Sequence, residues 1–148
     1  MAEELYVDIV VPDGHVFQGN AELVRAPGVE GSFEVLRNHA PMIAAFGVGM
    51  LVVKTDDAHR FADVFEDRII FATSGGFLEV LNNRVTVLAE TAEPASDIDV
   101  ERARNAEERA LQRLQERRDG IDRARAEEAL ERARNRLRIA MGQVGTNQ

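Results

Sequence analysis

The last third of the chain, residues 97–143, constrains the fold most strongly because it has the periodicity of two amphipathic helices. Apolar residues recur there at intervals of three and four. Asp119 and Gly120 divide the stretch, and a short turn makes two helices antiparallel neighbours. More than half of the apolar positions are alanines, which bury little area, so we expect a helical hairpin that is only marginally stable by itself. The two stripes are Ala103, Ala106, Ala110 and Leu114 on the first helix and Ala126, Leu130, Ala133, Leu137 and Met141 on the second.

The ends of both predicted helices are marked by residues that cap or interrupt helices. Residues 91–95 include a proline, which disfavours helix in the residue before it, so a short linker is expected there. Ser96 or Asp97 can then begin the first helix by accepting hydrogen bonds from its free N–H groups. Gly120 is predicted to end the first helix in a left-handed conformation. Asp122 is predicted to cap the second helix.

Residues 1–90 show a different pattern, in which short β-branched and aromatic runs alternate with Gly, Pro, Asn and Asp. This rhythm is typical of a β-sandwich or barrel. Asn82 and Asn83 suit a two-residue hairpin because asparagine tolerates positive φ. The chain is therefore expected to be a two-domain α+β protein, with a β domain over 1–90 and a linker and helical hairpin over 91–148. The predicted strands include Leu5–Val11, His15–Phe17, Ala21–Ala26 after a turn at Gly19 and Asn20, Met50–Lys54, His59–Phe65, Arg68–Thr73, Phe77–Leu81 and Arg84–Ala89.

Composition narrows the classes of function. The net charge of −8 argues against general nucleic-acid binding, and all of it lies in residues 1–90, whereas the hairpin region is balanced. The absence of cysteine excludes disulfides and thiolate chemistry. No apolar run approaches the roughly 18 residues that a membrane span needs. Because the first residues are acidic rather than basic, we expect no signal peptide and a bacterial-type cytoplasmic protein.

No catalytic or metal site is predicted. The sequence contains neither a Gly-x-x-x-x-Gly-Lys-Ser/Thr phosphate loop nor a His-Glu-x-x-His pair. Ser74 has no identifiable basic partner and is interpreted as a turn residue beside Gly75. His39, close to Pro41, is interpreted as a loop histidine whose ring bonds to the backbone.

The arginines of the hairpin form the strongest candidate for a binding site. Arg102 and Arg109 are seven residues apart and share one helix face, and Arg132 and Arg136 are four apart on the other helix. If the helices fold together, the four guanidinium groups could converge on a polyphosphate, which they bind bidentately. The alternative interpretation is a solvated surface with i, i+4 ion pairs such as Glu128 with Arg132.

Several segments are distinctive enough to be compared with a known family. They are Glu30–Phe33 with Val35 and Leu36, Asn38–Met42, Gly75–Val80, Asn83–Glu90 and the helix start at Ile98 and Asp99. Together they resemble the epsilon subunit of bacterial F-type rotary ATP synthases, and the likeness covers the whole chain. Glu34 and Arg37 depart from the family pattern, in which a small residue and a proline or alanine are usual.

The resemblance implies a ten-stranded antiparallel β-sandwich followed by an antiparallel two-helix hairpin. It implies a non-catalytic rotor subunit that joins the gamma subunit to the ring of c subunits, peripheral to the cytoplasmic side of the inner (plasma) membrane. The hairpin would fold down on the sandwich, or extend into the alpha/beta catalytic head and inhibit ATP hydrolysis. The loop residues expected to contact the c-ring are Glu30, Gly31, Ser32, His39 and Met42.

The resemblance also implies a nucleotide site, because some members bind ATP in the folded-down state. No cofactor is required, and ATP would be a regulatory ligand. The alternative is a purely structural coupler that binds no nucleotide, and an enzyme is a distant third possibility. The residues that match the family's ATP motif are Glu93, Ile98, Asp99, Arg102, Ala103, Arg109, Arg132 and Arg136.

Overall fold

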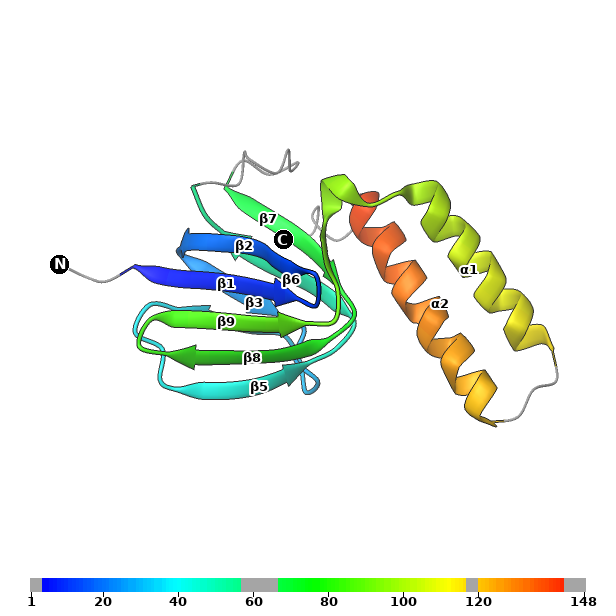
Figure 1. Cartoon of the computed structure of the whole chain (residues 1–148), viewed down its shortest axis with the longest axis horizontal. Helices are drawn as coiled ribbons and strands as arrows, with labels where there is room; N and C mark the ends of the chain where they lie inside the picture. The colour runs from blue at the N-terminus through cyan, green and yellow to red at the C-terminus, as the bar shows by residue number, and fades with distance from the viewer. Residues whose placement is uncertain (1–3, 57–66, 117–119, 143–148) are drawn as a thin grey trace. The chain divides into compact units, whose positions relative to one another are not determined.

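The computed structural model describes residues 4–56, 67–116 and 120–142 (Figure 1). The chain consists of two compact units, Met1–Ser96 and Asp97–Gln148, which are described separately below.

The first unit is a β-sandwich of two five-stranded sheets. The order of strands in the first sheet is β2-β1-β9-β8-β5, and in the second it is β10-β7-β6-β3-β4 (Figure 1). The strand pairings are antiparallel except for β1 with β9, which run parallel. The expected ten-stranded sandwich is thus confirmed, with one parallel pair. The strands are β1 (Leu5–Val11), β2 (Gly14–Ala21), β3 (Leu23–Ala26), β4 (Phe33–Leu36), β5 (Met42–Phe46), β6 (Gly49–Lys54), β7 (Arg68–Thr73), β8 (Gly76–Leu81), β9 (Arg84–Ala89) and β10 (Ala92–Pro94).

The core lies between the two sheets and follows from the two-residue period of the strands. Every second residue of β1, from Leu5 to Ile9, has no exposed surface, and Phe71 of β7 is equally buried in the facing sheet. The β8–β9 hairpin confirms the prediction for its turn, because Asn82 and Asn83 have φ of 50° and 60°. These left-handed residues match the twist of the flanking strands.

Two of the expected boundaries in this unit are wrong, and one prediction lies outside the described residues. Gly19 and Asn20 do not form a turn; they extend β2, where Gly19 pairs with Val7 of β1. Residues 92–94, interpreted as linker, form the edge strand β10 on β7. A proline is tolerated there because an edge strand leaves some of its N–H groups without a ladder partner. The strand expected at His59–Phe65 falls among the residues that are not described.

The second unit is the helical hairpin of α1 (Val100–Gln115) and α2 (Gly120–Ala140). Four alanines of the two stripes are buried, as the periodicity predicted: Ala103 and Ala110 on α1, and Ala126 and Ala133 on α2. Met141 is an exception because it is 53% exposed.

The predicted helix ends need correction. The cap of α1 is Asp99, because Ala95–Asp97 form a short 3-10 turn before it. Gly120 does not end the first helix with a positive φ; it is the first residue of α2. Asp122 therefore lies within the first turn of α2 and does not cap it. Asp119, the other residue of the predicted turn, lies outside the described residues.

Candidate functional site

Four of the residues that match the family's ATP motif lie together at the N-terminus of α1: Ile98, Asp99, Arg102 and Ala103. The side-chain Oδ1 of Asp99 accepts a hydrogen bond of 3.0 Å from the backbone N–H of Arg102, and its carbonyl accepts one of 3.0 Å from Ala103. Ile98 and Ala103 are buried, whereas the Arg102 side chain is exposed. The motif thus has a local structural role: it caps the helix and directs an arginine outward.

Two contacts fix the alignment of the helices. Arg134 of α2 donates to the Glu107 carboxylate at 3.2 Å, and Arg123 donates to the carbonyl of Leu114 at 3.4 Å. This antiparallel register places Arg109 level with Arg132 and Arg102 level with Arg136. Because an α-helix has about 3.6 residues per turn, all four arginines lie on the face opposite the Glu107–Arg134 pair. We call these four residues (Arg102, Arg109, Arg132 and Arg136) the arginine face.

The two faces of the hairpin differ in how their charges are satisfied. The opposite face has a groove of about 540 Å³ where Glu107, Glu127 and Glu131 lie among arginines. On the arginine face, by contrast, the guanidinium groups of Arg102, Arg109 and Arg132 have no hydrogen bond or ion pair with any residue that the structure describes. The expected pair between Glu128 and Arg132 is not among the described contacts. This face therefore offers unneutralised cations that an anion can bind.

Glu93, the remaining predicted nucleotide residue, belongs to the sandwich. It lies in β10, where its register partner is Ala72, and it is half-buried. The predicted set is thus divided between the two units. Glu93 lies in the sandwich unit, and the other seven residues lie in the hairpin unit.

The predicted c-ring contact residues are also divided. Glu30, Gly31 and Ser32 lie in the connection between β3 and β4, beyond the end of both strands. Met42 begins β5. His39 lies in the loop before it, and the ring Nδ1 of His39 hydrogen-bonds to the Ala40 carbonyl oxygen at 2.7 Å. The bridge between Gly28 and Phe46 places the β3–β4 connection at the opposite end of β5 from Met42.

The two departures from the family pattern lie on either side of Val35. Glu34 pairs in register with Arg25, and their side chains form an ion pair with an Nε–Oε1 distance of 3.0 Å. Arg37 is exposed beside Asn38, whose backbone N–H donates to the Asn83 side chain at 2.6 Å. The larger Glu34 is thus accommodated by an arginine on the neighbouring strand.

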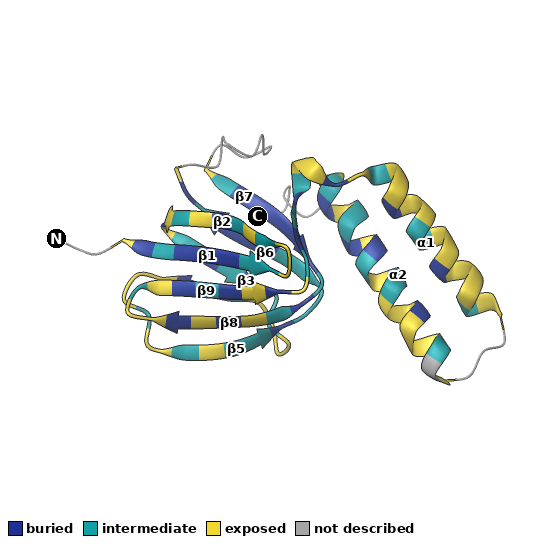
Figure 2. Cartoon of the chain, in the orientation of Figure 1, coloured by how far each residue is buried: buried dark blue, intermediate teal, exposed yellow. Residues whose placement is uncertain are grey.

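A second candidate surface, which the sequence analysis missed, is the outer face of the first sheet. Four large apolar side chains are exposed there: Ile43 (73%), Phe77 (59%), Leu81 (48%) and Leu88 (54%). Phe77 lies directly opposite Leu88 of β9, and β8 places Leu81 on the same side. Along β8 exposed positions alternate with buried ones, and along β9 exposed or half-buried positions do so (Figure 2). We call these four residues the apolar patch; the signal for it was apolar residues on both faces of β8.

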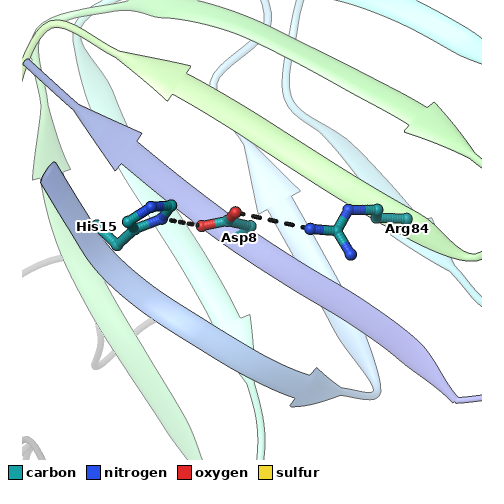
Figure 3. A network of polar contacts seen from close by, with 3 residues as sticks. All are labelled: Asp8, His15 and Arg84. Carbon is teal, nitrogen blue, oxygen red and sulfur yellow. Dashed lines mark hydrogen bonds and ion pairs between the residues drawn. The ribbon is translucent and has the colours of Figure 1, made fainter.

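The same face also carries a polar network. The buried Asp8 carboxylate contacts the ring Nδ1 of His15 at 2.8 Å and the guanidinium of Arg84 at 3.8 Å (Figure 3). The Arg84 guanidinium also lies 4.8 Å from the centre of the Tyr6 ring. These contacts join β2, β1 and β9 and satisfy the charges beside the apolar patch.

The described residues contain no group of three or more His, Cys, Asp or Glu side chains that could hold a metal ion. Among them there is also no helix that is long and apolar enough to cross a membrane.

The fold and these surfaces define a small β-sandwich that carries a charged helical hairpin, and sequence comparison identifies its class. The family described as "ATP synthase, Delta/Epsilon chain, beta-sandwich domain" matches residues 4–95, and "ATP synthase, Delta/Epsilon chain, long alpha-helix domain" matches residues 96–141. The chain belongs to this family. Two relatives confirm the expected resemblance to bacterial epsilon subunits.

Individual relatives match all or nearly all of the chain. The ATP synthase epsilon chain of Salinibacter ruber is 69% identical over 148 residues, which cover 100% of this chain and 99% of the relative. That of Nitratidesulfovibrio vulgaris is 44% identical over 139 residues, or 94% and 97% of the two chains. Among solved structures, a chain of the Euglena gracilis mitochondrial ATP synthase has a TM-score of 0.74 at 23% identity, covering 89% of this chain and 78% of that one. The fold is therefore shared even where the sequences have diverged.

Proposed function

We propose that this chain is a non-catalytic subunit of the central stalk, which joins the gamma subunit to the ring of c subunits in a proton-translocating ATP synthase. The match of both family domains, which together cover residues 4–141, supports this assignment. Chains with the same fold occur in solved assemblies described as "OSCP/F1/c-ring" and "central stalk/cring". In this proposal the chain is peripheral to the inner (plasma) membrane, on its cytoplasmic side, and reaches the membrane only through the complex.

The apolar patch is the surface we assign to the gamma subunit. Monomeric proteins rarely expose contiguous large apolar side chains, and such patches mark docking sites. Here they lie side by side on neighbouring strands of a sheet whose other face is the core. The β3–β4 connection, with Glu30–Ser32 and the 71% exposed Val29, is the proposed contact with the c-ring.

We further propose that the arginine face binds ATP and regulates the position of the hairpin. The observation that supports this is the three guanidinium groups without described partners, all on one face of two aligned helices. An ATP triphosphate would be held by bidentate contacts to them. The helices meet mainly through alanines, which bury little area, so few contacts within the hairpin resist a change in its conformation. A ligand that binds one position shifts the population toward it.

The proposed regulation has a direction. With ATP bound, the arginines are neutralised and the hairpin stays folded down on the sandwich, with Glu93 completing the site. Without ATP, Arg102, Arg109 and Arg132 engage acidic surfaces of the alpha/beta head, and the extended hairpin inhibits hydrolysis. A two-state equilibrium of this kind responds to ATP only as far as ATP binds the two states with different affinity.

Calorimetric titration of the full chain with ATP tests the binding site. Arg109→Ala combined with Arg132→Ala should abolish the binding heat, because both residues lie on the arginine face. Arg134→Ala is the matched control, since Arg134 lies on the opposite face and pairs with Glu107. No heat for the unaltered chain at millimolar ATP would refute nucleotide binding, and equal loss in the control would refute the assignment to this face.

The alternative function is a purely structural coupler, and truncation after Ala95 separates the two. This variant keeps all ten strands and removes the hairpin. It should still assemble with gamma and c subunits under either proposal. Hydrolysis of ATP by the assembled head should rise on truncation only if the hairpin inhibits, and an unchanged rate would favour the structural coupler.

A further inference from the structure

Glu79 occupies an unusual position on the outer face of the first sheet. It is exposed at the centre of β8, and Phe77 and Leu81 flank it on the same side of the strand. Its register partners are Ile43 on β5 and Thr86 on β9. Directly opposite side chains in an antiparallel pair lie about 5 Å apart at Cβ, so the carboxylate is surrounded on most sides by the apolar patch.

The carboxylate has no counter-charge within the part of the sandwich that the structure describes. Arg84 is its diagonal neighbour across β8 and β9, but the Arg84 guanidinium is directed to Asp8 and lies over Tyr6 (Figure 3). His15 also contacts Asp8. The described basic groups of this face therefore contact Asp8 rather than Glu79. Among the described residues, none forms a hydrogen bond or ion pair with the Glu79 side chain.

Docking of a partner would remove this carboxylate from water. A buried charge without a partner loses its hydration, and this penalty is large enough to offset much of the gain from the apolar side chains around it. An apolar partner surface is therefore a poor match for this face. The match improves if the partner supplies a cation at the centre of its own apolar contact.

We propose that Glu79 is the charge anchor of this docking surface and pairs with an arginine or lysine of the gamma subunit. This inference rests on the proposed docking of gamma on the apolar patch and adds the residue that selects the partner. A second copy of this chain is a poor occupant, because a symmetric contact centred on this residue would oppose two Glu79 carboxylates.

Binding of recombinant gamma subunit to the full chain, measured by calorimetry, tests the inference. Glu79→Gln keeps the shape and removes the charge, and it should raise Kd about 30-fold or more, as expected for the loss of one member of a buried ion pair. Glu79→Lys should bind still more weakly, because it places two cations together. Asp13→Asn, in the exposed β1–β2 turn, is the matched control and should leave Kd unchanged.

The outcomes separate this inference from the function it rests on. If Phe77→Thr weakens gamma binding but Glu79→Gln changes Kd by less than about threefold, well short of the value expected for a buried pair, docking on this face stands and the charge anchor is refuted. The same conclusion holds if Glu79→Lys binds at least as tightly as Glu79→Gln. If neither the Phe77 nor the Glu79 variant weakens binding, gamma does not use this face and both proposals fail.

Discussion

Replacement of Phe77 by threonine should separate the stability of the free protein from its affinity for the gamma subunit. The Phe77 side chain is 59% exposed. A phenylalanine offers roughly 200 Å² of surface, so about 120 Å² is available for a partner to cover. At about 25 cal/mol per Å², full coverage contributes roughly 3 kcal/mol, and half coverage about 1.5 kcal/mol. The expected rise in Kd therefore lies between about 10-fold and 150-fold.

The same substitution should hardly change the free protein. Threonine keeps a high β propensity, and a change at an exposed position usually alters the free energy of unfolding by about 0.5 kcal/mol or less. The adjacent Leu78 is the contrast, because it points into the core with 0% exposure. Leu78→Ala should destabilise the protein by about 2–5 kcal/mol.

Calorimetric titration with gamma gives Kd, and denaturant unfolding of each free variant gives the stability. The reasoning would be refuted by an unchanged Kd for Phe77→Thr. It would also be refuted by a loss of 2 kcal/mol or more in the free variant, since Phe77 would then be part of the fold rather than of a docking surface.

Three further predictions follow from local geometry. Gly76→Ala should lower the free energy of unfolding by more than about 2 kcal/mol, because φ is 155° and a Cβ would collide with the backbone carbonyl of Leu88; thermal unfolding measures this. Asp99→Ala should destabilise the first turn of α1 by about 1 kcal/mol through loss of its cap, seen as faster amide exchange there. The hydrogen bond from Arg68, and then its charge, hold the pKa of Asp67 below the ordinary 3.8, so the stabilisation is present above that pH and is lost as the pH falls through the lowered pKa. Because this pair is exposed, Asp67→Asn should reduce the acid-induced loss of unfolding free energy by less than about 0.5 kcal/mol. Denaturant unfolding at neutral and acidic pH measures this difference.

The sequence predicted those parts of the fold that depend on local chemistry. Asn82 and Asn83 predicted the β8–β9 hairpin correctly, because asparagine tolerates the positive φ that both residues adopt there. The alanine stripe of the hairpin followed from helical periodicity. The turn predicted at Gly19 and Asn20 is wrong: both residues favour turns, yet pairing with β1 keeps them in β2. Their conformation was decided by a neighbouring strand, which propensity does not include.

The parts that could not be predicted depend on contacts between distant residues. The parallel pairing of β1 with β9 joins strands almost eighty residues apart, and no local pattern encodes it. Pro94 made a linker the natural prediction for residues 92–94. The strand β10 forms there because these residues pair with the edge of the sheet at β7, which the local sequence does not indicate. The apolar patch was likewise hidden, since a run of apolar residues in β8 does not reveal which of them face outward until the register is fixed.

The candidate nucleotide residues were predicted in part from spacing and in part from resemblance. Spacing placed Arg102 with Arg109, and Arg132 with Arg136, on common helix faces. It could not show that both pairs lie on the same side of the hairpin. That conclusion required the contact between Glu107 and Arg134, which fixes the alignment of the two helices.

The central claim, that ATP controls the position of the hairpin, can be measured directly because the chain contains no cysteine. Spin labels attached to cysteines introduced at the exposed residues Asp13 in the sandwich and Glu108 in α1 report the distance between the two units. Pulsed electron resonance should give a broad distribution of distances without ATP and one narrow, short distance at saturating ATP. The Arg109→Ala, Arg132→Ala variant should stay broad in both conditions. A distribution that ATP leaves unchanged in the chain with all its arginines would contradict the account.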